Sequence, residues 1–242
     1  MTSLPLTPLL VFFYLSLATA TTHNVVSFGA KGDGETNSTN PFLNAWAAAC
    51  GSEQPATIYV PPGTYLLGKV KFEKCKNHNI TILINGTLVA PSDYRVLGKH
   101  LNWILFERVH GVSIYGGTLD GRGTRLWACK ASGSDCPQGA TTLEFSNSNH
   151  ILIDGLTSRK SQKFHVVINN CIDVHVQRMK ISASANSSNT DGIHVQSSSS
   201  VSIFNSTIAT GDDCISIGPG TTNLWIENIA CGPGHGVRSY FA

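Results

Sequence analysis

The chain has 242 residues, 13% of them charged, and a formal net charge of +2. This length suits one large domain with a sizeable core, and no basic stretch with interleaved aromatic residues suggests binding to nucleic acid. Low charge together with 23 glycines and many β-branched residues indicates an all-β protein with many turns.

Residues 1–20 are predicted to be a secretory signal peptide. Leu9–Leu17 is an apolar run too short to span a bilayer, and Ala18-Thr19-Ala20 follows it as an A-x-A cleavage site. The basic residues that usually precede such a run are missing, so a buried apolar segment of the mature fold is the alternative. No later run is long and apolar enough to cross a membrane, and no membrane partner is expected.

Five N-x-S/T sequons fit passage through the secretory pathway. They begin at Asn37, Asn79, Asn85, Asn186 and Asn205. We therefore expect a secreted, extracellular protein, whose mature domain covers residues 21–242.

A short helix is predicted over residues 40–50. Pro41 stands in its first turn and the body is rich in alanine. Such a helix would lay Phe42, Trp46 and Ala49 over the open end of a repetitive fold, because the end coil of a solenoid needs a cap.

Downstream, short segments that alternate apolar and polar residues recur in two interleaved sets. The first set starts at Val112, Ile151, Val174, Val201 and Leu224; the second starts at His165, Gly192, Cys214 and Gly236. Apart from one longer gap, the spacing within each set is 22 to 27 residues. That period leaves little room for crossover helices, so the economical fold is a right-handed parallel β-helix, a coil stacked on itself. Ile193, Ile215 and Val237 should then stack, as should Val195 and Ile217.

The seven cysteines should mostly pair in an oxidising compartment. The sequence contains no C-x-x-C motif, so their spacing does not indicate a zinc site. We predict local bridges Cys129–Cys136 and Cys214–Cys231, with Cys50–Cys75 as a further pair. Cys171 would be left over and buried.

The repeat also aligns polar residues. Asp191, Asp213 and His235 are each 22 residues apart, and Asp212 is adjacent to Asp213. In a coil of that length they share one column, with neighbours about 5 Å apart. Like charges at this spacing repel, so the cluster is easier to explain by chemistry than by folding, although solvated turn acids are the plain alternative.

Strict alternation would put Asp213 on the same face as Ile215, inside the core. An unpaired carboxylate cannot be buried there. We therefore expect each regular strand to begin after its aspartate, with a bend at the aspartate itself.

Three tripeptides now carry a resemblance. Asn189-Thr190-Asp191, Gly211-Asp212-Asp213 and Gly234-His235-Gly236 match, in order and spacing, three of four motifs of the glycoside hydrolase family that contains the plant polygalacturonases. Further matching segments extend the resemblance over most of residues 23 to 236, including Leu119–Gly123 and Gly218–Asn228.

The resemblance implies inverting hydrolysis of α-1,4-linked galacturonan in pectin, without metal or other cofactor. Asp212 would be the general acid, Asp191 and Asp213 would hold and deprotonate the attacking water, and His235 would orient the proton or contact the sugar. An inverting site needs roughly 6.5–9.5 Å between its acid and base carboxyl groups. Asn189 would contact substrate, and the expected partner is the pectin polymer of the cell wall, bound by a monomer.

The fourth motif, an Arg-x-Lys that would grip the substrate carboxylate, is not found after Gly236. Arg238 falls in the wrong coil to replace it. Because an ion-pairing clamp contributes several kcal/mol, we expect the chain as given to fold poorly or to be inactive.

Two other functions stay open: a Ca²⁺-dependent lyase on the same fold, and a catalytically dead homologue that binds pectin. Outside the cluster, His165 and His194 are interpreted as packing or rim residues. Trp46, Trp127 and Trp225 are interpreted as core or cap. Arg159, Lys160 and Lys163 are interpreted as an exposed face that could help to hold an anionic polymer.

Overall fold

A computed structural model describes residues 20–240. The predicted signal peptide therefore lies outside the described residues, apart from Ala20. Within the described part of the chain, no helix has both the length and the apolarity needed to cross a bilayer.

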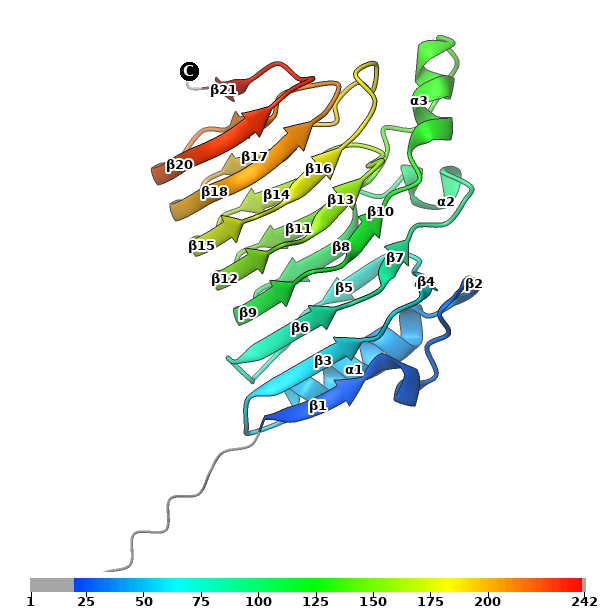
Figure 1. The fold of residues 1–242 in the computed structure, drawn as a ribbon, viewed down its shortest axis with the longest axis vertical. Helices are drawn as coiled ribbons and strands as arrows, with labels where there is room; N and C mark the ends of the chain where they lie inside the picture. Colours follow the sequence, from blue (N-terminus) through cyan, green and yellow to red (C-terminus); the bar gives the residue numbers. More distant parts are fainter. Residues whose placement is uncertain (1–19, 241–242) are drawn as a thin grey trace, which may run out of the picture.

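The molecule is a parallel β-helix, as the repeat predicts (Figure 1). One sheet contains two rows of strands. The first row stacks β1 (Thr21–Asn24), β3 (Ala56–Val60), β6 (Ile80–Ile84), β9 (His110–Tyr115), β12 (Asn149–Asp154), β15 (Ile172–Gln177), β18 (Ser199–Ala209) and β20 (Thr222–Cys231). The second row stacks β2 (Asp33–Asn37), β4 (Thr64–Leu66), β7 (Thr87–Val89), β10 (Thr118–Asp120), β13 (Thr157–Arg159) and β16 (Lys180–Ser182), and joins the first row through the long strand β18.

A second parallel sheet closes each coil. It stacks β5 (Val70–Phe72), β8 (Asn102–Glu107), β11 (Thr141–Ser146), β14 (Val166–Asn169), β17 (Ile193–Gln196), β19 (Ile215–Ile217) and β21 (Val237–Ser239). The helical elements are the 3₁₀ turn η1 (Val25–Phe28), α1 (Thr39–Cys50), α2 (Arg95–Gly98) and α3 (Thr124–Ala131).

The register confirms the predicted stacking. Val112, Ile151, Val174 and Val201 are consecutive partners across four strands, each at most 1% exposed. On the second sheet Ile193 pairs with Ile215, which pairs with Val237, and Val195 pairs with Ile217. The buried members of these rows form the continuous apolar core that holds successive coils in one register, whereas Val237 is 51% exposed.

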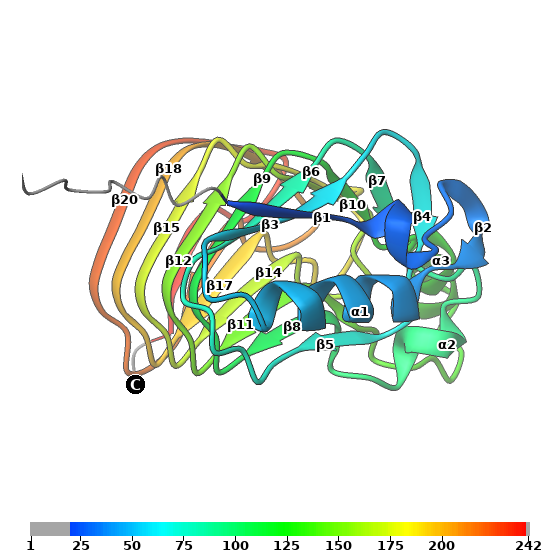
Figure 2. The same cartoon turned by 90° about the horizontal axis from the view of Figure 1, so that it is seen from below.

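Helix α1 covers the N-terminal end of the core (Figure 2). It begins one residue earlier than predicted, at Thr39, and it buries Phe42, Trp46 and Ala49 as expected. The Trp46 ring packs against Phe72 with ring centroids 5.1 Å apart, and its indole N–H donates to the Glu73 carbonyl.

All three predicted disulfides are present: Cys50–Cys75, Cys129–Cys136 and Cys214–Cys231. Cys171 is free and buried, also as predicted. The interpretation of Trp225 was wrong, because its side chain is 63% exposed on β20 and not part of a core or cap. The alternation in β20 turns Leu224 and Ile226 inward and Trp225 outward.

Candidate active site

The turns that lead into the second sheet carry the predicted column of polar residues. Asp191, Asp213 and His235 each stand two residues before a strand, in front of β17, β19 and β21. Since Ile193, Ile215 and Val237 are in register, the three polar residues lie on successive coils.

Asp212 lies within a set of hydrogen-bond donors. The backbone N–H of Asn189 donates to its Oδ2 at 3.0 Å, and the N–H of Asp213 donates to its Oδ1 at 2.9 Å. The Nδ1 atom of His235 is 3.3 Å from the same Oδ1, and the side chain of Asp212 is 21% exposed. Asp212 is therefore held in place and still open to a ligand.

Asp213 is fully buried, but it is not unpaired. The Tyr240 hydroxyl donates to its Oδ2 at 2.7 Å, and the Arg238 Nε lies 3.4 Å from its Oδ1. As expected, β19 begins only after Asp213, at Ile215, but the backbone bends at Gly211–Asp212 and at Cys214, on either side of Asp213 and not at Asp213 itself. A cation and a phenol thus offset the cost of burying this carboxylate, which alternation alone had made implausible.

Asp191 is the third carboxyl group and is 6% exposed. Burial raises the pKa of Asp191 above its ordinary value, and the negative charges of Asp212 and Asp213 raise it further. The crowding expected from the 22-residue spacing therefore acts most clearly on this residue.

One ligand atom from each of Asp212, Asp213 and His235 lies within 4.8 Å of the others. Carboxylate and imidazole groups are donors that divalent cations accept. The Arg238 guanidinium already contacts Asp213, however, and would repel a second cation. The donor set therefore fits a metal poorly.

Asp191 and Asp212 open onto a groove, here called the acidic groove. It is lined by Phe164, Asn189, Asp191, His194, Gln196, Asp212, Gly218, Pro219 and Tyr240. Asn189 lies there as predicted, with an exposed side chain, and its backbone N–H holds Asp212. His194 is a rim residue, since its ring stacks on Phe164 and its Nδ1 is 2.8 Å from the Ser216 hydroxyl.

His165 is a packing residue, completely buried, with its Nδ1 2.8 Å from the Ser158 hydroxyl. Burial lowers the pKa of His165 to about 3, so its ring stays neutral. It belongs to the core and not to the groove.

Two residues of the site were not predicted from the sequence. Arg238 was considered only as a clamp for the substrate, which its coil rules out, and Tyr240 was not named. The register offers a signal for Arg238, because His194, Ser216 and Arg238 are consecutive partners, 22 residues apart. Tyr240 carries no such signal, since it follows β21 and has no strand partner among the described residues.

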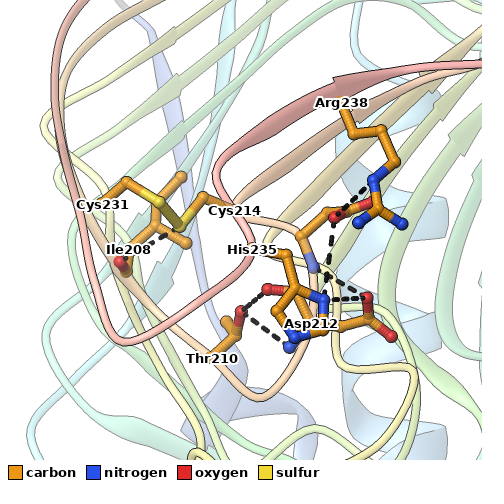
Figure 3. The surroundings of a disulfide bond; sticks show 8 residues. Ile208, Thr210, Asp212, Cys214, Cys231, His235 and Arg238 are labelled. Carbon is orange, nitrogen blue, oxygen red and sulfur yellow. Dashed lines mark hydrogen bonds and ion pairs between the residues drawn. A yellow bond between two sulfur atoms is a disulfide. The ribbon is translucent and has the colours of Figure 1, made fainter.

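In these turns the backbone passes so close to neighbouring atoms that only glycine fits. A Cβ at Gly211 would lie 2.2 Å from the Ser187 carbonyl oxygen, and one at Gly234 would lie 2.8 Å from the Cys214 sulfur. Figure 3 shows the Cys214–Cys231 bridge near Asp212 and His235, which lie on the turns before β19 and β21. The disulfide and the glycines together fix the backbone that presents the carboxyl groups.

Three carboxyl groups with different surroundings and one imidazole can divide proton donation and proton acceptance between them. The acidic groove lies beside them. This chemistry suits acid–base cleavage of a bond that lies in the groove.

Comparisons with known proteins agree. A family model described as "Glycosyl hydrolases family 28" matches residues 50–239. A polygalacturonase of Prunus persica is 60% identical over 233 residues, which are 94% of this chain and 59% of that protein. An exopolygalacturonase of Arabidopsis thaliana is 40% identical over 220 residues, 90% of this chain and 51% of that protein. This chain therefore spans about half to three fifths of the length of these curated relatives.

Solved structures share the fold. The endo-xylogalacturonan hydrolase of Aspergillus tubingensis superposes with a TM-score of 0.79 at 25% identity, covering 90% of this chain and 59% of that one. A polygalacturonase from Erwinia carotovora gives 0.74 at 21% identity, covering 94% and 69%. The family model matches most of the chain, and its aspartate motifs lie on adjacent coils of a parallel β-helix. The chain therefore belongs to glycosyl hydrolase family 28.

Proposed function

We propose that the acidic groove hydrolyses α-1,4-galacturonosyl linkages of pectin, with inversion at the anomeric carbon. The observation that carries the proposal is that Asp191 and Asp212 line one groove of a family 28 chain, with Asp213 buried next to Asp212. The printed names of the most similar relatives, polygalacturonase and exopolygalacturonase, support galacturonan as the substrate.

Asp212 is assigned as the general acid. Its carboxyl proton passes to the glycosidic oxygen as the bond to the leaving sugar breaks. The His235 Nδ1, 3.3 Å from Asp212 Oδ1, is close enough to orient that proton. Two backbone N–H groups keep the carboxyl group in one position.

Asp191 and Asp213 are assigned to the attacking water, which gives up one proton as its oxygen bonds to the anomeric carbon. The raised pKa of Asp191 makes it a stronger base once it is ionised. Asp213, held by Tyr240 and Arg238, supplies a fixed negative charge that orients the water.

Arg238 directs its charge at Asp213, a carboxylate of the protein itself. It is therefore not assigned as the clamp for the substrate carboxylate.

We also propose that the protein works outside the cell, in the cell wall. Three disulfides are typical of an oxidising compartment. All five sequon asparagines are exposed, which fits a glycosylated surface.

The test is release of reducing ends from polygalacturonate by the chain and by its Asp212→Asn variant. Loss of the general acid should lower the rate by about 10²- to 10⁴-fold. Asp173→Asn is the matched control, because Asp173 contacts His150 and His175 outside the acidic groove, and it should leave the rate unchanged.

The alternatives give other results. A lyase would leave a double bond that absorbs ultraviolet light, and its activity would disappear on chelation of Ca²⁺. A pectin-binding homologue would retain polygalacturonate without releasing ends, and Asp212→Asn would not alter its behaviour. Either pattern would contradict the proposed hydrolysis.

A further inference from the structure

A second pocket lies on the same edge of the solenoid, where strands of the first sheet lead toward the second. It is lined by Ser92, Asp120, Arg122, Thr124, Arg125 and Lys160, and is called the basic pocket below. Its side chains come from three coils, those of β7, β10 and β13, and from the start of α3. None of them takes part in the chemistry proposed above.

The backbone forces two of its cations together. The N–H groups of Gly121 and Gly123 donate to the carbonyl oxygens of Arg159 and Lys160, at 2.9 and 2.7 Å. A Cβ at Gly123 would lie 2.5 Å from the Ser161 carbonyl oxygen, so the approach needs glycine. Arg122, between the two glycines, is thereby fixed beside Lys160, although their like charges oppose that arrangement.

The acid in the pocket does not neutralise these cations. Asp120 is 6% exposed, and its Oδ2 is 2.9 Å from the Arg159 Nε. Its Oδ1 accepts the backbone N–H of Arg122 at 3.0 Å. The Asp120 charge is therefore balanced by Arg159.

Three positive charges remain, on Arg122, Arg125 and Lys160. Within residues 20–240 none of the three lies within 4.0 Å of a carboxylate oxygen, whereas other Lys and Arg side chains make seven such contacts. The pKa of Asp93 is lowered mainly by its hydrogen bonds with Arg95, and less by Arg125. Asp93 is thus already paired, and the pocket keeps an uncompensated positive charge.

One segment connects the basic pocket with the acidic groove. Lys160 lines the pocket, and Phe164, four residues later, lines the groove. Between them, the Lys163 ammonium lies 4.9 Å from the centroid of the Phe164 ring. Cationic side chains therefore continue from the pocket to the rim of the groove.

The strand register sets the separation along the solenoid. Asp120 pairs with Arg159, Arg159 with Ser182 and Ser182 with Ala209, three residues before Asp212. The pocket thus lies two to three coils from the Asp212 turn, or roughly 10–15 Å at about 4.8 Å per coil. A single sugar cannot bridge that distance, whereas an oligosaccharide can.

We propose that the basic pocket binds a carboxylate of an acidic polysaccharide, several sugars away from the linkage that lies at Asp212. The inference rests on the proposed function for its ligand class. It adds a subsite, made of Arg122, Arg125 and Lys160, that recognises the charge of the uronic acid and favours long, unesterified chains.

The experiment measures retention of the chain in native gels that contain polygalacturonate. Arg122→Gln/Arg125→Gln/Lys160→Gln should weaken binding about tenfold at low salt, and the difference should shrink as salt rises. Lys74→Gln/Lys76→Gln/Arg108→Gln is the matched control. It removes the same charge from the turns between β5 and β6 and between β8 and β9, and should stay within about twofold of the unmodified chain.

A single Arg125→Gln variant tests the subsite with little risk of misfolding. Arg125 is exposed and makes no side-chain hydrogen bond in the described part of the chain. It should weaken binding about twofold. Equal retention of the triple variant and the control would overturn the subsite. So would an equal difference on fully methyl-esterified pectin, which is uncharged, or no retention of the unmodified chain.

Failure of the proposed hydrolysis would look different. If Asp212→Asn leaves the release of reducing ends unchanged while the triple variant still loses retention, the catalytic assignment fails and the subsite stands. If Asp212→Asn abolishes release while the triple variant and the control bind alike, hydrolysis stands and the subsite fails.

Discussion

At the scale of single residues, the depth of each carboxyl group decides its chemistry. Asp212 is partly exposed and faces the groove, whereas Asp213 is fully buried against Arg238 and Tyr240. Asp191 lies between these extremes, and burial next to two other acids raises its pKa. Three identical side chains on adjacent coils therefore need not share one role.

The raised pKa of Asp191 has a consequence for stability. The folded state binds this proton more tightly than the unfolded state does, so the contribution of Asp191 to stability is complete below pH 3.8, its ordinary pKa, and is lost as the pH rises through the folded value. Asp191→Asn removes this dependence. We expect the variant to have a higher melting temperature than the unmodified chain at pH 7, with the gain shrinking toward pH 4.

Thermal unfolding at the two pH values checks this, with Glu53→Gln, an exposed acid, as the control. The same Asp191→Asn variant should lose activity by about 100-fold or more if Asp191 is the base. A variant that is less stable at pH 7 than at pH 4, relative to the unmodified chain, would contradict the assignment of burial as the cause.

Most residues of the site could be predicted from the 22-residue period, because equal spacing on a solenoid places side chains on one column. Arg238 and Tyr240 could not be assigned to Asp213 in that way. Their contacts depend on the direction in which β21 and the residue after it leave the coil, which no periodicity encodes.

At the scale of elements, the Cys214–Cys231 bridge connects the turn after Asp213 to the end of β20. Cys214 is completely buried, and its sulfur would lie 2.8 Å from a Cβ at Gly234, next to His235. The disulfide therefore supports two of the turns that carry site residues. The Cys129–Cys136 bridge, by contrast, closes a surface loop at the end of α3.

Removing each bridge in turn should show which disulfide supports the active site and which contributes only to stability. Cys214→Ala/Cys231→Ala should lower the free energy of unfolding by about 2–4 kcal/mol and also reduce the release of reducing ends. Cys129→Ala/Cys136→Ala, the matched control, should lower stability by a similar or smaller amount and leave the rate per folded molecule unchanged. Urea unfolding and the reducing-end assay measure the two effects. Equal rates for the two double variants would show that the first bridge does not support the site.

The elements themselves were largely predictable. The alternating segments from residue 112 onward are strands in the expected register, and the alanine-rich helix caps the core. The sequence did not indicate that β18 would run unbroken over both rows of the first sheet, from Ser199 to Ala209. Whether the chain bends between the two rows depends on how it packs against the neighbouring coils. Strand β18 does not break there, and it pairs with both β15 and β16.

At the scale of the whole molecule, the surface and the cross-links favour an extracellular setting. Five exposed sequon asparagines and three disulfides occur on a fold whose core is continuous from α1 to the last coils. Expressed in a secreting plant or yeast host, the chain should appear in the medium with Thr21 as its first residue. Treatment with an N-glycosidase should lower its apparent mass. Retention in the cell with residues 1–20 attached would contradict the predicted signal peptide.

The sequence by itself determined the repeat, the column of Asp191, Asp213 and His235, and the three disulfide pairs. A fixed period converts directly into neighbours on a solenoid, since each coil must satisfy the hydrogen bonds of the next. Only the tertiary structure decided that Asp213 is buried against Tyr240 and Arg238, and that Arg122 and Lys160 share a pocket. Those contacts join turns of unequal length, where backbone direction and close packing, and not spacing, decide which side chains meet.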